Sequence, residues 1–375
     1  MSTTTQVTVP YVHLGAQYDG IKEQVLERIG ALLDSGAFIL GKEVSDFEQA
    51  FAALCGTKHA LGVANGTDAL FLSLMALSIG KGDEVITAPN SYLASASSIF
   101  LAGGTPVFAD VLDDFNLDPE AVRKAITSKT KAIIAVHLTG RPARMKELLA
   151  IAKEHGLKVI EDCAQAIGAK LDGQHVGSFG NAGCFSLHPL KNLAAAGDGG
   201  VITTNDDKVY GHLLKARNHG LRDRDNCEFF SYNSRLDNLQ AAILNVKLPE
   251  LPRWTLRRRA IAATYIKRLN GVGDLLLPYD GKGEFSVYHT FIIQTARRDV
   301  LKQYLADHGV DSKVHYPVPI HLQEAAEFLG YKRGDFPVTE RQAETILSLP
   351  IFAELSDEQV GYVADTVLAF FNAKG

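Results

Sequence analysis

Apolar residues in the N-terminal part of the chain follow a helical period. In residues 21–36 they recur every three or four positions, and residues 42–56 repeat the pattern. This spacing places apolar side chains along one face of a helix, so it predicts two amphipathic helices. Gly36 stands just past the first of them, where a glycine is a typical end signal.

From residue 59 onward, short apolar runs alternate with helical segments. Runs that are apolar almost throughout are typical of parallel strands covered on both faces. Their repeated alternation with helices predicts an α/β fold with right-handed crossovers. The strand predictions are residues 59–64, 84–88, 105–110, 132–138 and 158–163.

After about residue 240 the alternation gives way to a mixed pattern. A long arginine-rich helix is predicted over residues 249–269. We expect strands in residues 285–295 and 312–319, and helices near residues 298–309, 338–348 and 357–370. This mixture indicates a smaller α+β domain over residues 246–375, following a large α/β domain over residues 1–245.

The long helix carries four arginines, Arg253, Arg257, Arg258 and Arg259. Charged residues that cluster on a helix most often form a solvated face, and we expect that arrangement here. The alternative is that they contact a nucleotide diphosphate.

Composition and charge exclude some classes of protein. The chain has 375 residues, 46% hydrophobic and 22% charged, and its net charge of −5 offers no basic surface to nucleic acid. Its start lacks the pattern of a signal peptide, and no apolar run is long enough for a membrane span. None of the four cysteines forms a C-x-x-C pair, which disfavours zinc and dithiol chemistry. We expect a cytoplasmic protein with reduced thiols, no metal site, no nucleic-acid partner and no membrane association.

Asp162 stands where a predicted strand ends. Ligands of open α/β sheets bind at the carboxyl ends of the strands. Asp162 could cap the next helix, or it could hold a protonated ring nitrogen such as that of pyridoxal phosphate. The turn NGTDAL (65–70) offers a similar choice, because a helix N-terminus binds anions and Gly66 and Thr67 stand there. An ordinary capped helix start explains this turn equally well.

The stretch FSLHPLKN (185–192) contains a lysine among apolar neighbours. A lysine in a loop is usually a solvated charge, but one in an apolar pocket has a lowered pKa and can form a Schiff base. Lys191 is therefore a candidate nucleophile. Asp198, in the glycine-rich GDGG turn, is interpreted as a turn residue, and His188 is ambiguous.

Seven motifs, in order, resemble those of the sugar aminotransferase family often called DegT/DnrJ/StrS. They are NGTDAL, VHLTGRPARM, IEDCAQAIGA, FSLHPLKN, GDGG, YNSRLDNLQAAI and LSLP. The resemblance covers nearly the full chain. It implies the aspartate-aminotransferase fold (fold type I of pyridoxal-phosphate enzymes), with a mostly parallel seven-stranded sheet, and a homodimer with shared active sites.

The resemblance also implies roles for individual residues. Lys191 corresponds to the lysine that binds pyridoxal phosphate covalently and then moves a proton between substrate and cofactor. Asp162 corresponds to the partner of the pyridine nitrogen, Gln165 to the partner of the ring's 3-oxygen, and Tyr92 to the aromatic residue stacked on the ring. Asn233 corresponds to the asparagine that reaches the phosphate of the neighbouring subunit. The phosphate contacts within one chain correspond to Gly66, Thr67 and Ser186.

By the same resemblance, the donor is L-glutamate or glutamine and the acceptor is a nucleotide-linked keto-deoxysugar. The SRLD sequence within YNSRLD is similar to that of enzymes that aminate carbon 3, whereas His188 is similar to that of some 4-keto-sugar enzymes; we predict carbon 3. The segment HYPVPIH (315–321) resembles a substrate-side loop, which makes Tyr316 and His321 substrate candidates beside His188. A packed strand end is the alternative for this segment.

Three other functions compete with this interpretation. A keto-cyclitol (inosose-type) aminotransferase or a pyridoxal-phosphate sugar dehydratase would use the same scaffold, although the dehydratases replace the lysine with histidine. A regulatory, non-catalytic relative is the third. A nicotinamide dehydrogenase is disfavoured because the chain lacks the G-x-G-x-x-G fingerprint.

Overall fold

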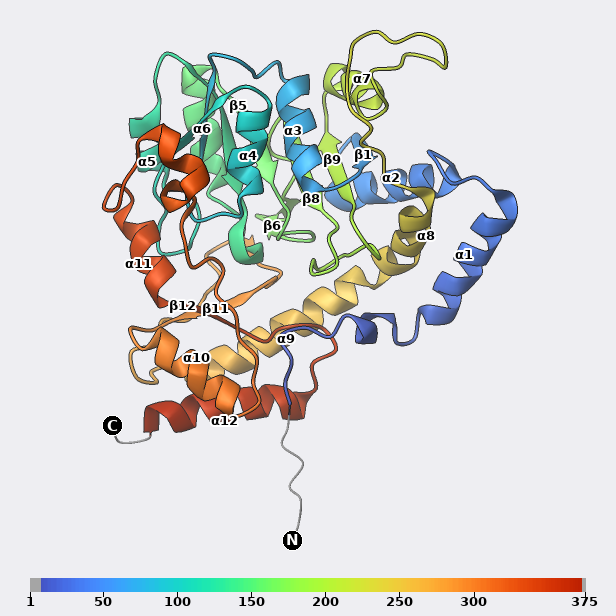
Figure 1. The fold of residues 1–375 in the computed structure, drawn as a ribbon. Coiled ribbons are helices and arrows are strands. Elements are labelled where there is room, and N and C mark those ends of the chain that lie inside the picture. The colour runs from blue at the N-terminus through green and yellow to red at the C-terminus, as the bar shows by residue number, and fades with distance from the viewer. Residues whose placement is uncertain (1–7, 373–375) are drawn as a thin grey trace.

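A seven-stranded sheet organises the larger part of the protein in the computed structural model, which describes residues 8–372 (Figure 1). Its strands are β1 (His59–Val63), β2 (Glu84–Thr87), β3 (Thr105–Phe108), β4 (Thr130–Val136), β5 (Lys158–Asp162), β8 (Ala182–Ser186) and β9 (Gly200–Thr204). Their order across the sheet is β1-β9-β8-β5-β4-β2-β3. Among the seven, β9 is antiparallel to both of its neighbours, and the other pairings are parallel. The predicted α/β fold with a mostly parallel seven-stranded sheet is confirmed.

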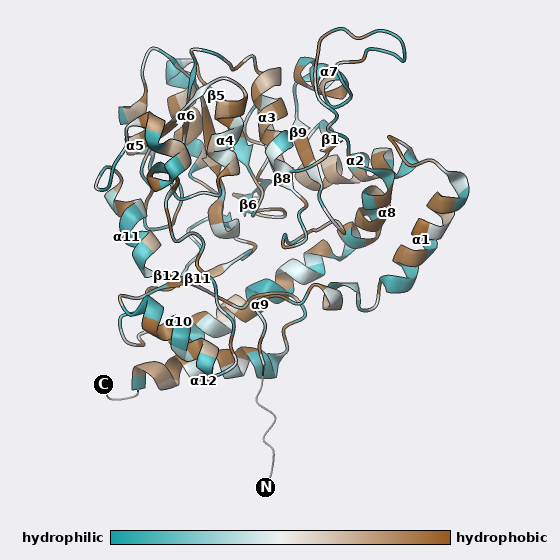
Figure 2. Cartoon of the chain, viewed as in Figure 1, coloured by the Kyte–Doolittle hydropathy of each residue, from teal (hydrophilic) through white to brown (hydrophobic). Residues whose placement is uncertain are grey.

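Helices cover both faces of the sheet, as the apolar runs predicted. In β4, Ile134 packs into the apolar cluster that contains residues of α3 (Gly66–Ala76) and α7 (Asp207–Ala216). The adjacent Ile133 and Ala135 pack on the opposite face, against α5 (Pro119–Ala125) and α6 (Met145–His155). The central strands and α3 are accordingly coloured mainly as hydrophobic in Figure 2.

The remaining helices of this part are α1 (Lys22–Ser35), α2 (Lys42–Cys55), α4 (Ala94–Leu101) and α8 (Asn238–Lys247). The two predicted N-terminal helices are confirmed, and both pack against α8. The first ends where expected, because Gly36 adopts the left-handed conformation and its N–H binds the carbonyl of Leu32. Among residues 8–372, no helix is both long enough and apolar enough to cross a membrane.

Beyond α8, the long helix α9 (Leu251–Leu269) leads to a second apolar core (Figure 1). This core is built on α10 (Arg298–Asp307), α12 (Asp357–Asn372) and a two-stranded antiparallel sheet of β11 (Phe291–Gln294) and β12 (Ile346–Leu349). The α+β mixture is as predicted. The domain boundary at residue 245, which falls inside α8, stays a prediction.

Short elements complete the described chain. A three-stranded antiparallel sheet contains β6 (Lys170–Leu171), β7 (Gln174–His175) and β10 (Glu284–Phe285). The helix α11 (Pro337–Thr345) precedes β12. The 3-10 turns are η1 (Gly15–Tyr18), η2 (Leu138–Gly140), η3 (Leu248–Glu250), η4 (Ile320–Leu322) and η5 (Glu324–Leu329).

Three predicted elements of the C-terminal part were wrong in extent or type. Residues 312–319 form no strand and make only an isolated bridge between Lys313 and Ser348. The predicted helix 338–348 ends at Thr345, because the next four residues pair with β11 as β12. In the predicted strand 285–295, only residues 291–294 join that sheet. Short apolar runs suit a strand or a buried helix equally well, and the pairing partner decides between them.

The expected solvated arginine face of the long helix is wrong for Arg258, and Arg257 and Arg259 are only partly exposed. Arg258 is buried and donates hydrogen bonds to the carbonyls of Tyr288, His289 and Ile351. Arg259 pairs with Asp280 across 2.8 Å and lies over the ring of Phe285. This side of α9 is covered by the segment 280–289, which the helical period alone does not reveal.

Candidate active site

Asp162 lies at the carboxyl end of β5, in the middle of the sheet. Its side chain is nearly buried, at 6% exposure. One carboxylate oxygen accepts a hydrogen bond from the Ser95 hydroxyl at 2.8 Å, and the other accepts from the backbone N–H of Ala164 at 3.1 Å. The carboxylate is therefore held in one orientation at the sheet edge where α/β proteins bind ligands.

Gln165 follows Asp162 by three residues and is fixed by two neighbours. Its carbonyl oxygen accepts from the backbone N–H of Thr139 at 2.7 Å, and its amide nitrogen lies 3.5 Å from the hydroxyl of Tyr316. Burial, with a smaller effect from the charge of Asp162, raises the pKa of Tyr316 to about 12. The structure therefore brings Asp162, Gln165 and Tyr316 together.

Lys191 lies in the loop that follows β8, the strand next to β5. Its backbone N–H binds the carbonyl of His188 at 2.8 Å, which closes a turn in that loop. Burial lowers the pKa of the Lys191 amine to about 8, although the charge of Asp162 opposes this shift. A lysine with such a pKa is available as a neutral nucleophile near neutral pH.

The start of α3 and the end of β8 form the third part of the site. Asn65 caps the helix, and its side chain accepts from the N–H of Asp68 at 2.8 Å. The first N–H groups of a helix, here those of Gly66 and Thr67, have no partner within it and attract anions. A Cβ atom on Gly66 would lie 2.7 Å from Cβ of Ser186, so only glycine allows the helix end to approach β8 this closely.

Two histidines that were not predicted as site residues, His289 and His315, have pKa values that burial and the charge of Lys191 lower. Burial and the charge of Lys191 lower the pKa of His315 to about 4 and that of His289 well below its ordinary value. His289 Nδ1 is 3.2 Å from the side-chain oxygen of Asn192, and His315 Nδ1 is 2.9 Å from the hydroxyl of Ser348. Isolated histidines in loop or strand-like segments carry no spacing signal that could have identified them.

The other predicted residues are distributed more widely. Tyr92 is 58% exposed, with its ring centroid 5.8 Å from that of Tyr316, so it borders the site. His188 and Asn233 are exposed. His321 is buried elsewhere, 3.0 Å from Glu340 and against the ring of Phe336. The structure therefore does not bring the candidate substrate residue His321 together with Lys191.

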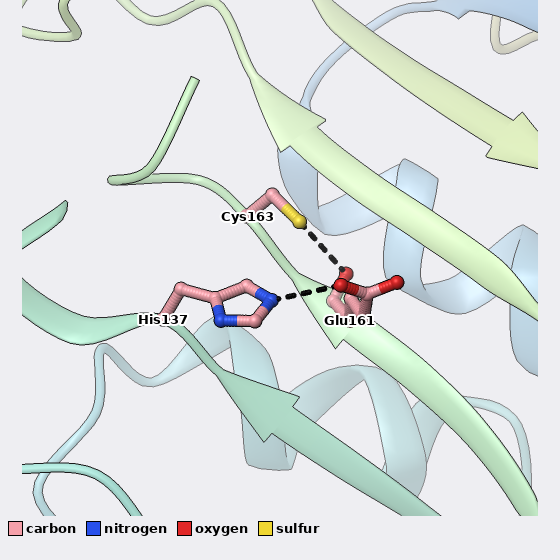
Figure 3. Close-up of side chains that lie close together, drawn as sticks. All are labelled: His137, Glu161 and Cys163. Carbon is pink, nitrogen blue, oxygen red and sulfur yellow. Dashed lines mark hydrogen bonds and ion pairs between the residues drawn. The ribbon is translucent and has the colours of Figure 1, made fainter. Parts of the chain in front are cut away.

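A second polar cluster, His137, Glu161 and Cys163, lies beside the site and is buried (Figure 3). His137 Nδ1 accepts from the N–H of Ala143, so Nε2 carries the proton and donates to Glu161 at 3.0 Å. The Glu161 carboxylate also accepts three backbone N–H groups, those of Gly177, Phe179 and Gly180, at 2.7–2.8 Å.

The three side chains of this cluster are of types that can bind a metal ion, but both carboxylate oxygens of Glu161 already accept short hydrogen bonds. Burial also raises the pKa of the Cys163 thiol well above its ordinary value, which opposes the thiolate that a metal would require. We interpret the cluster as a structural anchor for the loop 177–180.

The arrangement around Asp162 fits pyridoxal phosphate. An oriented carboxylate suits the protonated ring nitrogen, the Lys191 amine suits the aldehyde, and the start of α3 suits the phosphate. The phosphate position is shaped by the close contact between Gly66 and Ser186, which a Cβ atom on Gly66 would block.

The lowered pKa of Lys191 predicts how the cofactor-free protein reacts. Trapping of pyridoxal phosphate on Lys191 by borohydride should rise as the pH passes about 8, because the amine is protonated and unreactive below that value. Lys146 is the control, since its hydrogen bond and ion pair with Asp172 raise its pKa above 10.5. Mass spectrometry of the labelled peptides gives the measurement. Parallel pH profiles for the two lysines would contradict the prediction.

Fold and site together define the class of protein, a fold type I aminotransferase of the pyridoxal-phosphate enzymes. The chain belongs to the DegT/DnrJ/EryC1/StrS aminotransferase family, whose model matches residues 19–368.

The individual relatives bear names of two kinds, a regulatory protein and an aminotransferase. A "pleiotropic regulatory protein" of Geobacillus stearothermophilus is 45% identical over 97% of this chain and 99% of its own. A UDP-N-acetyl-3-dehydro-alpha-D-glucosamine 3-aminotransferase of Acidithiobacillus ferrooxidans is 44% identical over 97% and 98%.

Among solved structures, DesV of S. venezuelae, in complex with a ketimine intermediate, has a TM-score of 0.96 and 41% identity, covering 98% of this chain and 100% of DesV. NtdA of Bacillus subtilis, with bound cofactor PMP, has a TM-score of 0.91 and 28% identity, covering 97% and 85%.

Proposed function

We propose that this protein moves an amino group from L-glutamate to carbon 3 of a nucleotide-linked keto-deoxysugar, with pyridoxal phosphate as cofactor, in the cytoplasm. The observation that carries the proposal is the placement of Lys191 and Asp162 at the ends of the adjacent strands β8 and β5. A reactive amine and an oriented carboxylate at one sheet edge are the two groups that pyridoxal-phosphate chemistry requires.

When bound, pyridoxal phosphate supplies an electron sink for the negative charge that develops on the substrate carbon. The residues of the chain perform the remaining work. Asp162 binds the ring nitrogen and keeps it protonated, and the start of α3, with Ser186, binds the phosphate. Gln165 binds the 3-oxygen, and Tyr92 covers the ring. Lys191, neutral near pH 8, removes a proton from the amino donor and returns it on the other side of the transferred nitrogen.

The choice of carbon 3 rests on two observations. The segment YNSRLDNLQAAI resembles that of 3-keto-sugar enzymes, and the Acidithiobacillus ferrooxidans relative bears the name of a 3-aminotransferase. The substrate would enter past Tyr316, which lies beside Gln165, and past His188, which stands three residues before Lys191.

The test measures the reverse reaction, which starts from amino sugars. The purified protein, supplied with pyridoxal phosphate and 2-oxoglutarate, should form L-glutamate from a 3-amino nucleotide sugar. Glutamate from a 4-amino nucleotide sugar alone would contradict the choice of carbon, and glutamate from an aminocyclitol alone would favour the keto-cyclitol reaction. If no aldimine absorbance band stays with the protein after pyridoxal phosphate is added and the unbound cofactor is removed, the proposal as a whole is contradicted and a regulatory role is favoured.

A homodimer with shared active sites is part of the proposal. The loop after α7 projects from the molecule (Figure 1) and carries Phe230, which is 98% exposed. Tyr232 and Asn233 follow, and both are exposed. Phe230 and Tyr232 stand two positions apart, and exposed apolar side chains that form a contiguous patch mark surfaces that another chain covers. In the dimer, Asn233 would reach the phosphate in the partner's site.

Mixing two inactive variants tests the shared site. After equal amounts of Lys191→Ala and Asn233→Ala are unfolded and refolded together, half of the dimers are mixed, and each mixed dimer contains one intact site. We expect about a quarter of the wild-type rate of glutamate formation. If Asn233 served its own subunit, every site would lack one residue, and the mixture would be no more active than its components.

A further inference from the structure

Two buried serines form a hydrogen-bonded chain that ends at the Asp162 carboxylate. Ser95 belongs to the first turn of α4, and Ser91 lies just before that helix. Ser95 donates to the Asp162 carboxylate at 2.8 Å, and the hydroxyl oxygens of Ser91 and Ser95 are 2.7 Å apart. Both side chains are buried, and Ser95 has no exposed surface.

The direction of the chain of hydrogen bonds follows from the number of protons. A hydroxyl has one proton to donate, and that of Ser95 is given to the carboxylate. Ser91 must therefore donate to Ser95. Two hydroxyl dipoles then point in sequence at one carboxylate oxygen, and in such a chain each bond strengthens the next.

We propose that Ser95, supported by Ser91, is the residue that positions Asp162 for the ring nitrogen of the cofactor, an inference that rests on the proposed function. The carboxylate ends a strand, and its side chain could otherwise rotate. Ser95 holds one oxygen from α4 and Ala164 holds the other from the loop. The remaining lone pairs are thereby directed toward the position of the ring. Groups that orient a binding residue in this way commonly affect affinity almost as strongly as the binding residue itself.

Ser98 offers a matched control within the same helix. Its hydroxyl is equally buried, and it lies 3.4 Å from the backbone carbonyl of Ser95. Ser98→Ala removes a buried hydroxyl from α4 without removing a partner of Asp162. A role of Ser95 in helix packing alone predicts the same outcome for Ser95→Ala and Ser98→Ala.

The experiment measures the dissociation constant of pyridoxal phosphate by titrating the cofactor-free proteins, together with their melting temperatures. Ser95→Ala should bind about tenfold more weakly, the effect expected when a carboxylate loses a hydrogen-bond donor. Ser91→Ala should bind about threefold more weakly. Ser95→Thr keeps the hydroxyl and should bind within about twofold of the wild type. Ser98→Ala should bind as tightly as the wild type. The half-reaction with L-glutamate should follow the same order.

The outcomes separate this inference from the proposed function. A wild type that fails to bind pyridoxal phosphate overturns both. A wild type that binds it, with Ser95→Ala binding as tightly or Ser98→Ala weakened equally, overturns the positioning role alone. If Ser95→Ala does not fold, Ser91→Ala decides, because it shortens the hydrogen-bond chain without removing the bond to Asp162; unchanged binding by Ser91→Ala then counts against the proposal.

Discussion

Replacing Lys191 with alanine is expected to lower the rate of amino transfer by about a thousandfold or more, since the same amine binds the cofactor and moves the proton. The variant should still fold, because the substitution removes a charge that burial disfavours, as its pKa of about 8 indicates. Glutamate formation measures the rate, and urea denaturation measures the free energy of unfolding. Near-normal transfer by Lys191→Ala would show that the site has been assigned to the wrong residue.

The chain contains a matched control for this variant. Lys247, at the end of α8, is also buried, and burial lowers its pKa to about 8 as well. Its amine donates to Gln17 at 3.2 Å and lies 4.9 Å from the ring of Tyr18, and neither of these is a proposed site residue. Lys247→Met should keep amino transfer within about twofold of wild type, since it touches no group of the site. Equal loss of activity in both variants would mean that amino transfer is lost when any buried lysine is replaced, and not because of the position of Lys191.

Replacing Glu161 with alanine is expected to lower the free energy of unfolding by about 3–5 kcal/mol, the range for removing one partner from a buried charged network. Three backbone N–H groups and His137 would lose their acceptor at once. Glu161→Gln should recover little, because its amide nitrogen is a donor and would face two other donors in either orientation. These are Gly177 and His137 at one oxygen position, and Phe179 and Gly180 at the other. Urea denaturation of the cofactor-free protein gives the measurement.

The control for Glu161 is Glu154, whose side chain is 56% exposed and pairs with Arg123 on the surface. Glu154→Ala should leave the free energy of unfolding close to that of the wild type, as exposed ion pairs contribute little. A Glu161→Ala protein as stable as Glu154→Ala would contradict the role of the cluster as an anchor. The structural role proposed for Glu161 and the chemical role proposed for its neighbour Asp162 would then both have to be reconsidered.

The hydrophobic pattern predicted five of the seven strands of the sheet and the two N-terminal helices closely, because buried parallel strands and amphipathic helices have distinct periods. It did not single out β8 or β9. It failed where a partner decided the outcome. The run at Ile346–Leu349 is too short to show a period, and pairing with β11 makes it a strand. Arg258 looked solvated because the segment that covers it lies about 30 positions farther along the chain.

Strand ends and turns singled out Lys191 and Asp162, and the family resemblance added Gln165; their roles at the centre of the site stay a prediction. The supporting residues were not visible in the same way. Ser95 is one of several serines in ASASS, and nothing in that run marks the one that faces Asp162. In HYPVPIH the two histidines are equivalent by sequence, yet His315 lies near Lys191 and His321 is buried against Glu340.

The position of β9 has a consequence for how the protein is made. The edge strand β1 pairs with β9, so His59 meets Thr204 across the ladder, and a Cβ on Gly200 would lie 2.3 Å from the carbonyl oxygen of Asn65. About 140 residues must therefore leave the ribosome after β1 before its pairing partner exists. Until then the turn 65–70 has no β9 beside it, so the proposed phosphate position is incomplete in a nascent chain that ends before β9.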